Sequence, residues 1–198
     1  MKIQVHTTPE FNFVPIPKCA GTSIIAAMFR LKGLSPSEIH RCKKPRKTWV
    51  PDGTLTIAVI RDPVERAIST WKNKVHDTGP AGTMLVNVCG FDRGMGFSDY
   101  INRLYSEGLI NIKDNHVNTQ MSFIQHGACV EEAHNEITLI CMSKLASEWS
   151  RLGLESIFGP LGHLNQASQT IPILDTTTYA KILSLYSDDF DLWNSVTS

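Results

Sequence analysis

The sequence predicts an α/β fold in which a central parallel sheet is flanked by helices. Residues 55–60 (Leu-Thr-Ile-Ala-Val-Ile) form an alternating, β-branched segment typical of a strand, and Pro63 fits the first turn of a helix after it. Residues 11–16 begin the same order, an apolar strand followed by a helix. Strands that alternate with helices favour a parallel sheet, whose ligands bind beyond the carboxyl ends of the strands. We therefore expect ligands at these two junctions.

The first half of the chain contains both strand–helix pairs. We expect a short buried strand over Phe11–Ile16, ended by the prolines around it, and a helix over Gly21–Leu31. Residues 36–52 are polar, basic and contain proline, which is typical of a loop. The second pair is the strand Leu55–Ile60 and a helix over Pro63–Val75.

The second half is predicted to be mostly helical. Residues 79–96 are rich in glycine and indicate a long connection, after which Ser98 is a candidate helix cap. A third strand is expected over Glu136–Met142, and helices over Phe97–Glu107, His116–Gln125, Lys144–Leu152, Thr177–Ser187 and Asp188–Ser195.

Length and composition suit one globular domain spanning residues 1–198. Hydrophobic residues make up 42% and charged residues 19%, and 19 basic residues balance 19 acidic ones. A net-neutral chain has no bulk affinity for nucleic acid or anionic membranes, so an anion site must be a local cluster. The five cysteines lack the spacing of zinc pairs, and no metal site is expected. We see no signal peptide, membrane anchor or apolar run long enough to span a membrane, and expect a cytoplasmic or otherwise soluble protein.

The first junction, Pro17-Lys18-Cys19-Ala20-Gly21-Thr22-Ser23, has the features of a phosphate-binding loop. A helix start presents free N–H groups and the positive end of the helix dipole. Gly21 and Ala20 allow an oxygen close to the backbone, while Lys18 adds charge and the Thr22 and Ser23 hydroxyls can donate. The order differs from the triphosphatase loop G-x-x-x-x-G-K-[ST], because the lysine precedes the glycine. The alternative interpretation is an ordinary turn with Thr or Ser as a helix cap.

The second junction is Arg61-Asp62-Pro63-Val64-Glu65-Arg66-Ala67-Ile68-Ser69. Arg61 stands at a strand end, and its guanidinium matches phosphate oxygens, while the Ser69 hydroxyl can complete the contact. Asp62 and Glu65 suit a helix start, and Arg66 is expected to pair with acidic groups. Taken alone, the segment also fits a helix N-terminus with ordinary surface charges.

Together the two junctions resemble the PAPS-dependent sulfotransferases, closest to the carbohydrate branch, where PAPS is 3′-phosphoadenosine 5′-phosphosulfate. The resemblance implies a P-loop-like three-layer fold, PAPS as donor and PAP, its desulfated product, as the released nucleotide. In this family a PKxxGTS-like loop binds the 5′-phosphosulfate and an RDPxxRxxS-like segment binds the 3′-phosphate. By resemblance, the 5′ end is held by Lys18, Cys19, Ala20, Gly21, Thr22 and Ser23, and the 3′-phosphate by Arg61 and Ser69.

Three later segments also resemble the family. Residues 114–120 (Asp-Asn-His-Val-Asn-Thr-Gln) carry a histidine and, four residues on, a glutamine, although Val117 replaces the usual aromatic residue. Residues 161–168 resemble a loop near the nucleotide, where Asn165 and Ser168 are candidate contacts. Residues 186–193 resemble its closing Y-xx-DFxLF element.

The expected chemistry is in-line displacement by an acceptor hydroxyl, and the resemblance implies a carbohydrate as the acceptor. Lys18 would stabilise the charge on the leaving oxygen, and a histidine near neutral pKa would take the proton. His116 is the first candidate for this base and His40 the second. The basic run at residues 41–47 either attracts an anionic substrate or is a solvated loop.

Two other functions remain open from sequence. One is a P-loop kinase for nucleotides or small molecules, which would need the full triphosphatase loop and a magnesium-binding carboxylate. The other is a non-catalytic protein that binds a nucleotide or a glycan. The sequence identifies neither the acceptor nor the oligomeric state.

Overall fold

The computed structural model describes residues 5–30, 38, 53–78, 82–127, 137–162 and 172–197. The chain divides into two compact units. The sheet unit comprises Met1–Arg61, Gln120–Gln166 and Val196–Ser198, and the helical unit comprises Asp62–Thr119 and Ala167–Ser195. A single domain over residues 1–198 stays a prediction.

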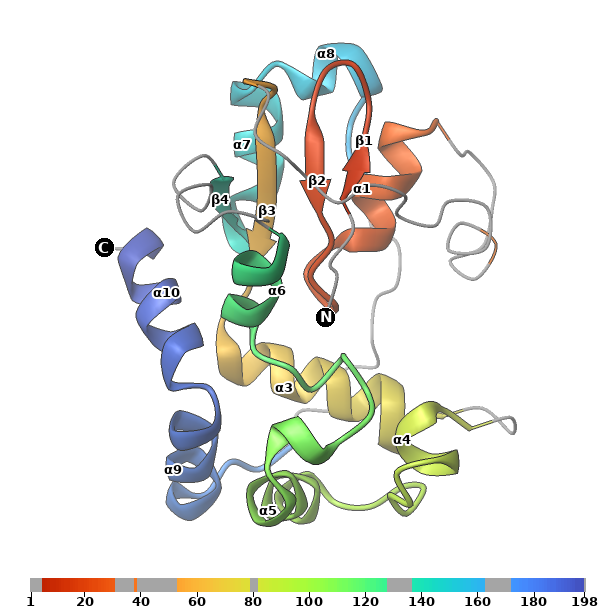
Figure 1. Ribbon diagram of the computed structural model, residues 1–198, viewed down its shortest axis with the longest axis vertical. Helices are drawn as coiled ribbons and strands as arrows, with labels where there is room; N and C mark the ends of the chain where they lie inside the picture. The colour runs from red at the N-terminus through yellow and green to blue at the C-terminus, as the bar shows by residue number, and fades with distance from the viewer. Residues whose placement is uncertain are drawn as a thin grey trace. The chain divides into compact units, whose positions relative to one another are not determined.

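The sheet unit is built on four strands in the order β1-β2-β3-β4 (Figure 1). They are β1 (His6–Thr7), β2 (Asn12–Val14), β3 (Thr56–Ile60) and β4 (Ile137–Cys141). β1 runs antiparallel to β2, whereas β2, β3 and β4 are mutually parallel. All five residues of β3 are buried, as expected for a central strand covered on both faces.

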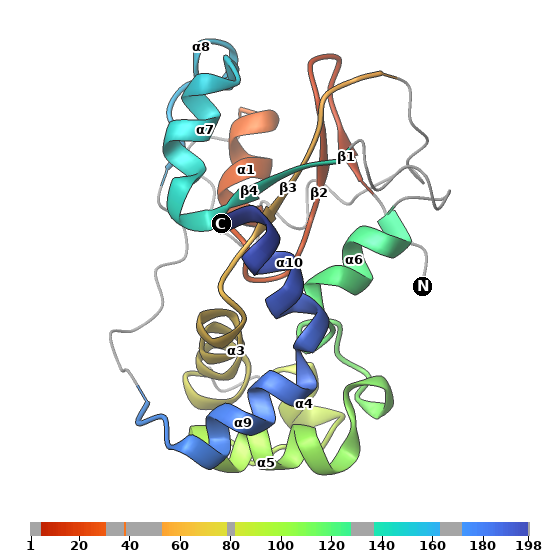
Figure 2. The same cartoon turned by 90° about the vertical axis from the view of Figure 1, so that its left-hand side faces the viewer.

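Helices cover both faces of this sheet. They are α1 (Gly21–Met28), α6 (Gln120–Gly127), η4 (Met142–Lys144), α7 (Leu145–Arg151) and α8 (Leu154–Phe158). Figure 2 shows α1 and α7 on one side of the sheet and α6 on the other. The predicted three-layer α/β fold with a mostly parallel sheet is therefore confirmed for this unit.

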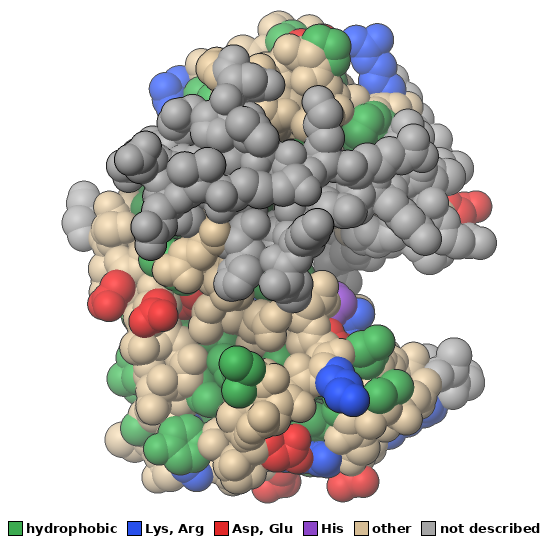
Figure 3. All heavy atoms as spheres, in the orientation of Figure 1, with side chains coloured by type: hydrophobic (Ala, Val, Ile, Leu, Met, Phe, Trp, Pro, Cys, Tyr) green, Lys and Arg blue, Asp and Glu red, His purple; other side chains and the backbone are tan. Residues whose placement is uncertain are grey.

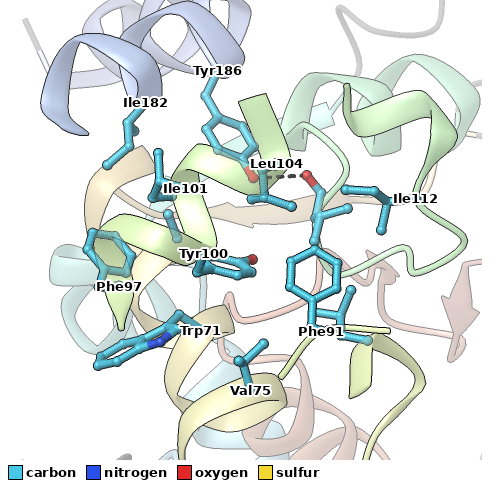
Figure 4. Close-up of a cluster of buried hydrophobic side chains, with 13 residues drawn as sticks. Trp71, Val75, Phe91, Phe97, Tyr100, Ile101, Leu104, Ile112, Ile182 and Tyr186 are labelled. Atoms are coloured by element: carbon cyan, nitrogen blue, oxygen red, sulfur yellow. Dashed lines mark hydrogen bonds between the residues drawn. The ribbon is translucent and has the colours of Figure 1, made fainter. Parts of the chain in front are cut away.

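The helical unit packs its elements around an aromatic core. Its elements are α3 (Pro63–Trp71), η1 (Lys72–His76), α4 (Met84–Asn87), α5 (Phe97–Glu107), η2 (Leu109–Asn111), α9 (Thr176–Leu185) and α10 (Ser187–Thr197). Figure 4 shows side chains from α3, α5 and α9, among them Trp71, Tyr100 and Ile182, pointing toward one another. This core fixes the positions of α3 and of the segment that precedes α6.

The structure departs from the predicted helices in several details. The helix from Pro63 ends as a π-helix, η1, because Asp77 N donates to Lys72 O (2.7 Å) across five residues. The helix expected from His116 begins only at Gln120, because turns occupy residues 114–118. Ser98 does not cap α5: the residue before that helix is Gly96, and the Ser98 hydroxyl contacts Asp175 Oδ2 (3.3 Å).

The described part of the face in Figure 3 carries charges of both signs. On the face shown in Figure 3, acidic and basic side chains are interspersed with hydrophobic ones. Among the described residues, no helix has the length and apolar character needed to cross a membrane.

Candidate active site

The loop between β2 and α1 has an unusual backbone. Lys18 (φ 69°) and Ala20 (φ 57°) both adopt the left-handed conformation, and between them Cys19 N donates to Ile16 O (3.2 Å). Side chains other than glycine adopt this conformation at an energetic cost, and such residues gather at ligand sites. The loop is therefore held in a backbone conformation that Lys18 and Ala20 adopt only at an energetic cost.

The N-terminus of α1 lacks the cap expected from sequence. The residue before the helix is Ala20, which has no side-chain cap hydrogen bond, so the Thr or Ser cap interpretation is wrong. Thr22 and Ser23 lie inside the first turn and are each 8% exposed. A Cβ added to Gly21 would come only within 4.0 Å of Phe13, so packing does not require a glycine there. The helix start and its glycine are suited to an approaching anion.

Cys19 belongs to the structure of the loop. It is fully buried, and its thiol contacts Gln120 Oε1 (3.3 Å) and Pro17 O (3.7 Å). Its amide is also used, in the bond to Ile16 O. Cys19 therefore supports the loop, and its predicted contact with the donor stays a prediction.

Arg61 follows the last residue of β3, and the carboxamide of Gln120 holds its backbone. Arg61 N donates to Gln120 Oε1, and Gln120 Nε2 donates to Arg61 O, both at 2.8 Å. The side chain of Arg61 is partly exposed. The two groups of the sheet unit proposed to bind phosphate, the loop at 18–23 and Arg61, are thus both linked to Gln120.

The helix that follows begins as predicted. Asp62 caps α3 by accepting a hydrogen bond from Glu65 N (2.9 Å), and Pro63 occupies the first helical position. Arg66 pairs with Asp189 Oδ2 (3.8 Å), and both side chains are almost fully buried, which confirms the predicted pairing role. Ser69 is 8% exposed.

His116 forms a hydrogen-bonded pair with Asp114 in the helical unit. Its Nδ1 lies 2.6 Å from Asp114 Oδ1, which also accepts from the His116 amide (2.9 Å). Burial raises the pKa of Asp114, but the hydrogen bonds and charge of His116 outweigh burial and lower it, with help from Lys74. The carboxylate is therefore ionised near neutral pH, Nδ1 is the donor, and Nε2 is the basic nitrogen of the neutral ring. The His116 side chain is 28% exposed.

The backbone at His116 is fixed by the surrounding helices. Its carbonyl accepts from Arg66 Nη2 and Thr70 Oγ1, each at 3.4 Å. Tyr186 donates its hydroxyl to Val117 O (3.0 Å), the dashed line in Figure 4. Burial raises the pKa of Tyr186 well above its ordinary value, so the hydroxyl keeps its proton and remains a donor. The backbone at His116 and Val117 is thus held by three hydrogen bonds from side chains.

Part of the predicted site lies outside the described residues. His40, Asn165, Ser168 and the basic run at 41–47 are in this group. Among the residues that are described, no group of three or more His, Cys, Asp or Glu side chains is placed to hold a metal ion.

Sequence reasoning missed the supporting residues Gln120, Asp114, Tyr186 and Asp189. Each lies in a segment that resembles the family. The hydrogen-bond or ion-pair partners of Gln120, Tyr186 and Asp189 are distant in sequence. Only Asp114 has a near partner, His116, two residues away. An Asp-x-His pattern is the only local signal that pointed to any of these contacts.

Comparison with known proteins identifies the family. A search of curated proteins and a search of solved structures each found no match. Residues 2–152 match the family model described as "Sulfotransferase family". The matched region includes both strand-to-helix junctions and the segment with His116, and it covers more than half of the 198 residues. On this evidence the chain belongs to the sulfotransferase family.

Proposed function

We propose that this protein transfers a sulfuryl group from PAPS to an acceptor hydroxyl, with a carbohydrate as the acceptor. The observation that carries the proposal is the loop at residues 17–23, which combines left-handed residues with an uncapped helix start in a sulfotransferase chain. An oxygen-rich anion is the ligand that such a loop fits best. The sulfotransferase family makes a sulfate donor the natural candidate.

The donor is proposed to be held at two phosphate sites. Lys18, Ala20, Gly21, Thr22 and Ser23 would bind the 5′-phosphosulfate through backbone N–H groups, hydroxyls and the lysine charge. Arg61 and Ser69 would bind the 3′-phosphate, Arg61 as a planar fork and Ser69 through its hydroxyl. A second phosphate site would distinguish PAPS from ATP, which lacks a 3′-phosphate.

The reaction is an in-line displacement at sulfur. The acceptor oxygen forms a bond to sulfur while the bond from sulfur to the 5′-phosphate oxygen breaks, and PAP leaves. Negative charge develops on that leaving oxygen, and we propose that Lys18 stabilises it. Positioning and charge stabilisation account for catalysis without a covalent enzyme intermediate.

The acceptor proton is proposed to pass to Nε2 of His116. Asp114 supports this role, because it holds Nδ1 as the donor and would stabilise the imidazolium that forms. His40 remains the second candidate for the base.

The test is sulfuryl transfer from labelled PAPS to a panel of glycans, phenols and small alcohols. We expect label to appear on a glycan, with PAP released in equal amount. Transfer only to phenols or small alcohols would contradict the carbohydrate acceptor but keep the sulfotransferase. Absence of transfer to every acceptor, together with tight binding of PAP or glycan, would instead identify a binding protein. Phosphoryl transfer from ATP–magnesium would identify a kinase.

A further inference from the structure

The carboxamide of Gln120 connects two separate parts of the sheet unit by hydrogen bonds. Gln120 is fully buried, yet its carboxamide makes three described contacts. Oε1 accepts from Arg61 N (2.8 Å) and from the Cys19 thiol (3.3 Å), and Nε2 donates to Arg61 O (2.8 Å). One side chain thus joins the residue after β3 to the loop after β2.

The backbone of Arg61 lies where the sheet ladder has ended. Pairing between β2 and β3 stops at Val14 and Ala58, and pairing between β3 and β4 stops at Ile60 and Cys141. The next residue would present an unpaired N–H and C=O, which are costly when desolvated. The carboxamide of Gln120 satisfies both, as a neighbouring strand would.

The position of Gln120 is itself fixed by packing. It is the first residue of α6, and Phe123 and Ile124, three and four residues on, are 3% and 4% exposed. Residues at these spacings share one face of a helix, so the carboxamide and the apolar anchors point the same way. α6 packs this face against β2. Its carboxamide therefore has little freedom to follow a moving backbone.

We infer that Gln120 is a positioning residue that sets Arg61 and the loop at 17–23 in register for the two phosphates of one nucleotide. This inference rests on the proposed function. Two hydrogen bonds of 2.8 Å join the Gln120 carboxamide to the backbone of Arg61, whereas a single contact of 3.3 Å joins it to the Cys19 thiol. Loss of the carboxamide should therefore disturb the 3′-phosphate contact more than the 5′ contact.

The experiment compares PAP with AMP, which differs from PAP only in lacking the 3′-phosphate. Affinities are measured by titration calorimetry for the full chain and for Gln120→Met, which keeps the side-chain length and removes the carboxamide. Arg61→Ala sets the full effect of losing the 3′-phosphate contact. Trp149→Phe is the matched control, because it removes one buried hydrogen bond, from Trp149 Nε1 to Gly159 O (3.0 Å), in the same unit.

We expect Gln120→Met to weaken PAP by about tenfold more than AMP, the pattern expected of Arg61→Ala. Trp149→Phe should lower the melting temperature and leave both affinities unchanged. Equal losses for PAP and AMP, or no loss in a folded Gln120→Met protein, would overturn the inference and leave the proposed function standing. A wild-type protein that does not bind PAP would overturn both.

A measurement on the wild type avoids dependence on the variant's folding. In the protein without nucleotide, the Arg61 amide should already exchange slowly with deuterated solvent, because Gln120 Oε1 accepts its hydrogen. Fast exchange of this amide that slows only when PAP is added would show that the nucleotide, not Gln120, sets the position, and would overturn the inference.

Discussion

In the proposed site, single residues would determine which charged groups contact the nucleotide. Lys18 stands in a left-handed conformation within a turn, one residue before the buried Cys19. Placing a cation on a strained, anchored backbone reduces the reorganisation needed when charge develops. The same reasoning applies to His116, whose carbonyl and ring are both held.

The first residue-scale prediction concerns Lys18. Lys18→Ala should lower turnover by roughly 10²–10³-fold and weaken PAP binding much less, because the leaving oxygen becomes fully anionic only as its bond to sulfur breaks. Steady-state kinetics with PAPS and calorimetry with PAP separate the two effects. Lys18→Gly is the control for backbone strain, since glycine accepts a positive φ. Should either variant change only the Michaelis constant for PAPS, Lys18 is a binding residue.

The second concerns the pH dependence of the pair formed by His116 and Asp114. The rate should rise with pH through the histidine range, because Nε2 must lose its proton before it can accept one. The lowered pKa of Asp114 keeps that carboxylate ionised throughout this range, so the limb belongs to the histidine. Asp114→Asn removes a negative charge that favours the imidazolium. The rising part of the pH–rate profile should therefore move to lower pH, and the maximal rate should fall.

His116→Ala should remove the limb and about 10²–10⁴-fold of the rate, with PAP binding retained. His40→Ala is the matched variant. If His40→Ala abolishes turnover while His116→Ala leaves most of it, the base is His40 and the pair has a structural role.

At the scale of elements, the local sequence pattern predicted those helices and strands whose formation depends on nearby residues. The helix over Phe97–Glu107 has the predicted bounds, and the strand predicted over Leu55–Ile60 forms from Thr56. α4 (Met84–Asn87) was missed, because it is short and lies in a glycine-rich stretch, and α8 (Leu154–Phe158) went unrecognised beside Gly153 and Gly159. Short helices of this kind depend on tertiary packing rather than on their own propensity.

In the candidate site too, groups that are contiguous in sequence could be predicted, and groups that are distant in sequence could not. The loop at 17–23 and Arg61 were recognisable because strand, anion-binding residues and helix are contiguous in sequence. The groups that support them were not, because Gln120 lies 59 residues from Arg61 and Tyr186 lies 69 residues from Val117. Which distant carboxamide or hydroxyl satisfies a given backbone group is set by the fold, so no local pattern contains it.

The element-scale prediction concerns the link between α3 and α10. Asp189→Ala should destabilise the protein by about 3–5 kcal/mol, because it leaves the buried guanidinium of Arg66 without its counter-charge. Denaturant unfolding measures this loss. Asp188→Ala, an exposed neighbour at the start of α10, should change stability by less than about 0.5 kcal/mol. Similar losses in the two variants would show that the ion pair with Arg66 is not what stabilises this contact.

At the scale of the whole molecule, recognition of a polyanion has to be local. The chain carries 19 basic and 19 acidic residues, so no net field draws a nucleotide to it. Affinity would then come from local clusters, among them the proposed groups placed by β2, β3 and the helices that follow them. Selectivity should therefore follow the number and spacing of the phosphates rather than total ligand charge.

The last prediction tests this selectivity by thermal unfolding of the full chain with PAP, ATP and ATP–magnesium. PAP at about 100 times its dissociation constant should stabilise the folded state by about 2.7 kcal/mol. For a chain of 198 residues this corresponds to a rise in melting temperature of roughly 5–10 °C. ATP carries a similar charge but no 3′-phosphate, so it should give a much smaller rise at the same concentration, with or without magnesium. A rise with ATP that equals the rise with PAP would mean that total charge is recognised, and an equal rise with ATP–magnesium would mean that a metal-bound triphosphate is recognised. In either case the assignment of Arg61 and Ser69 to a 3′-phosphate would be wrong.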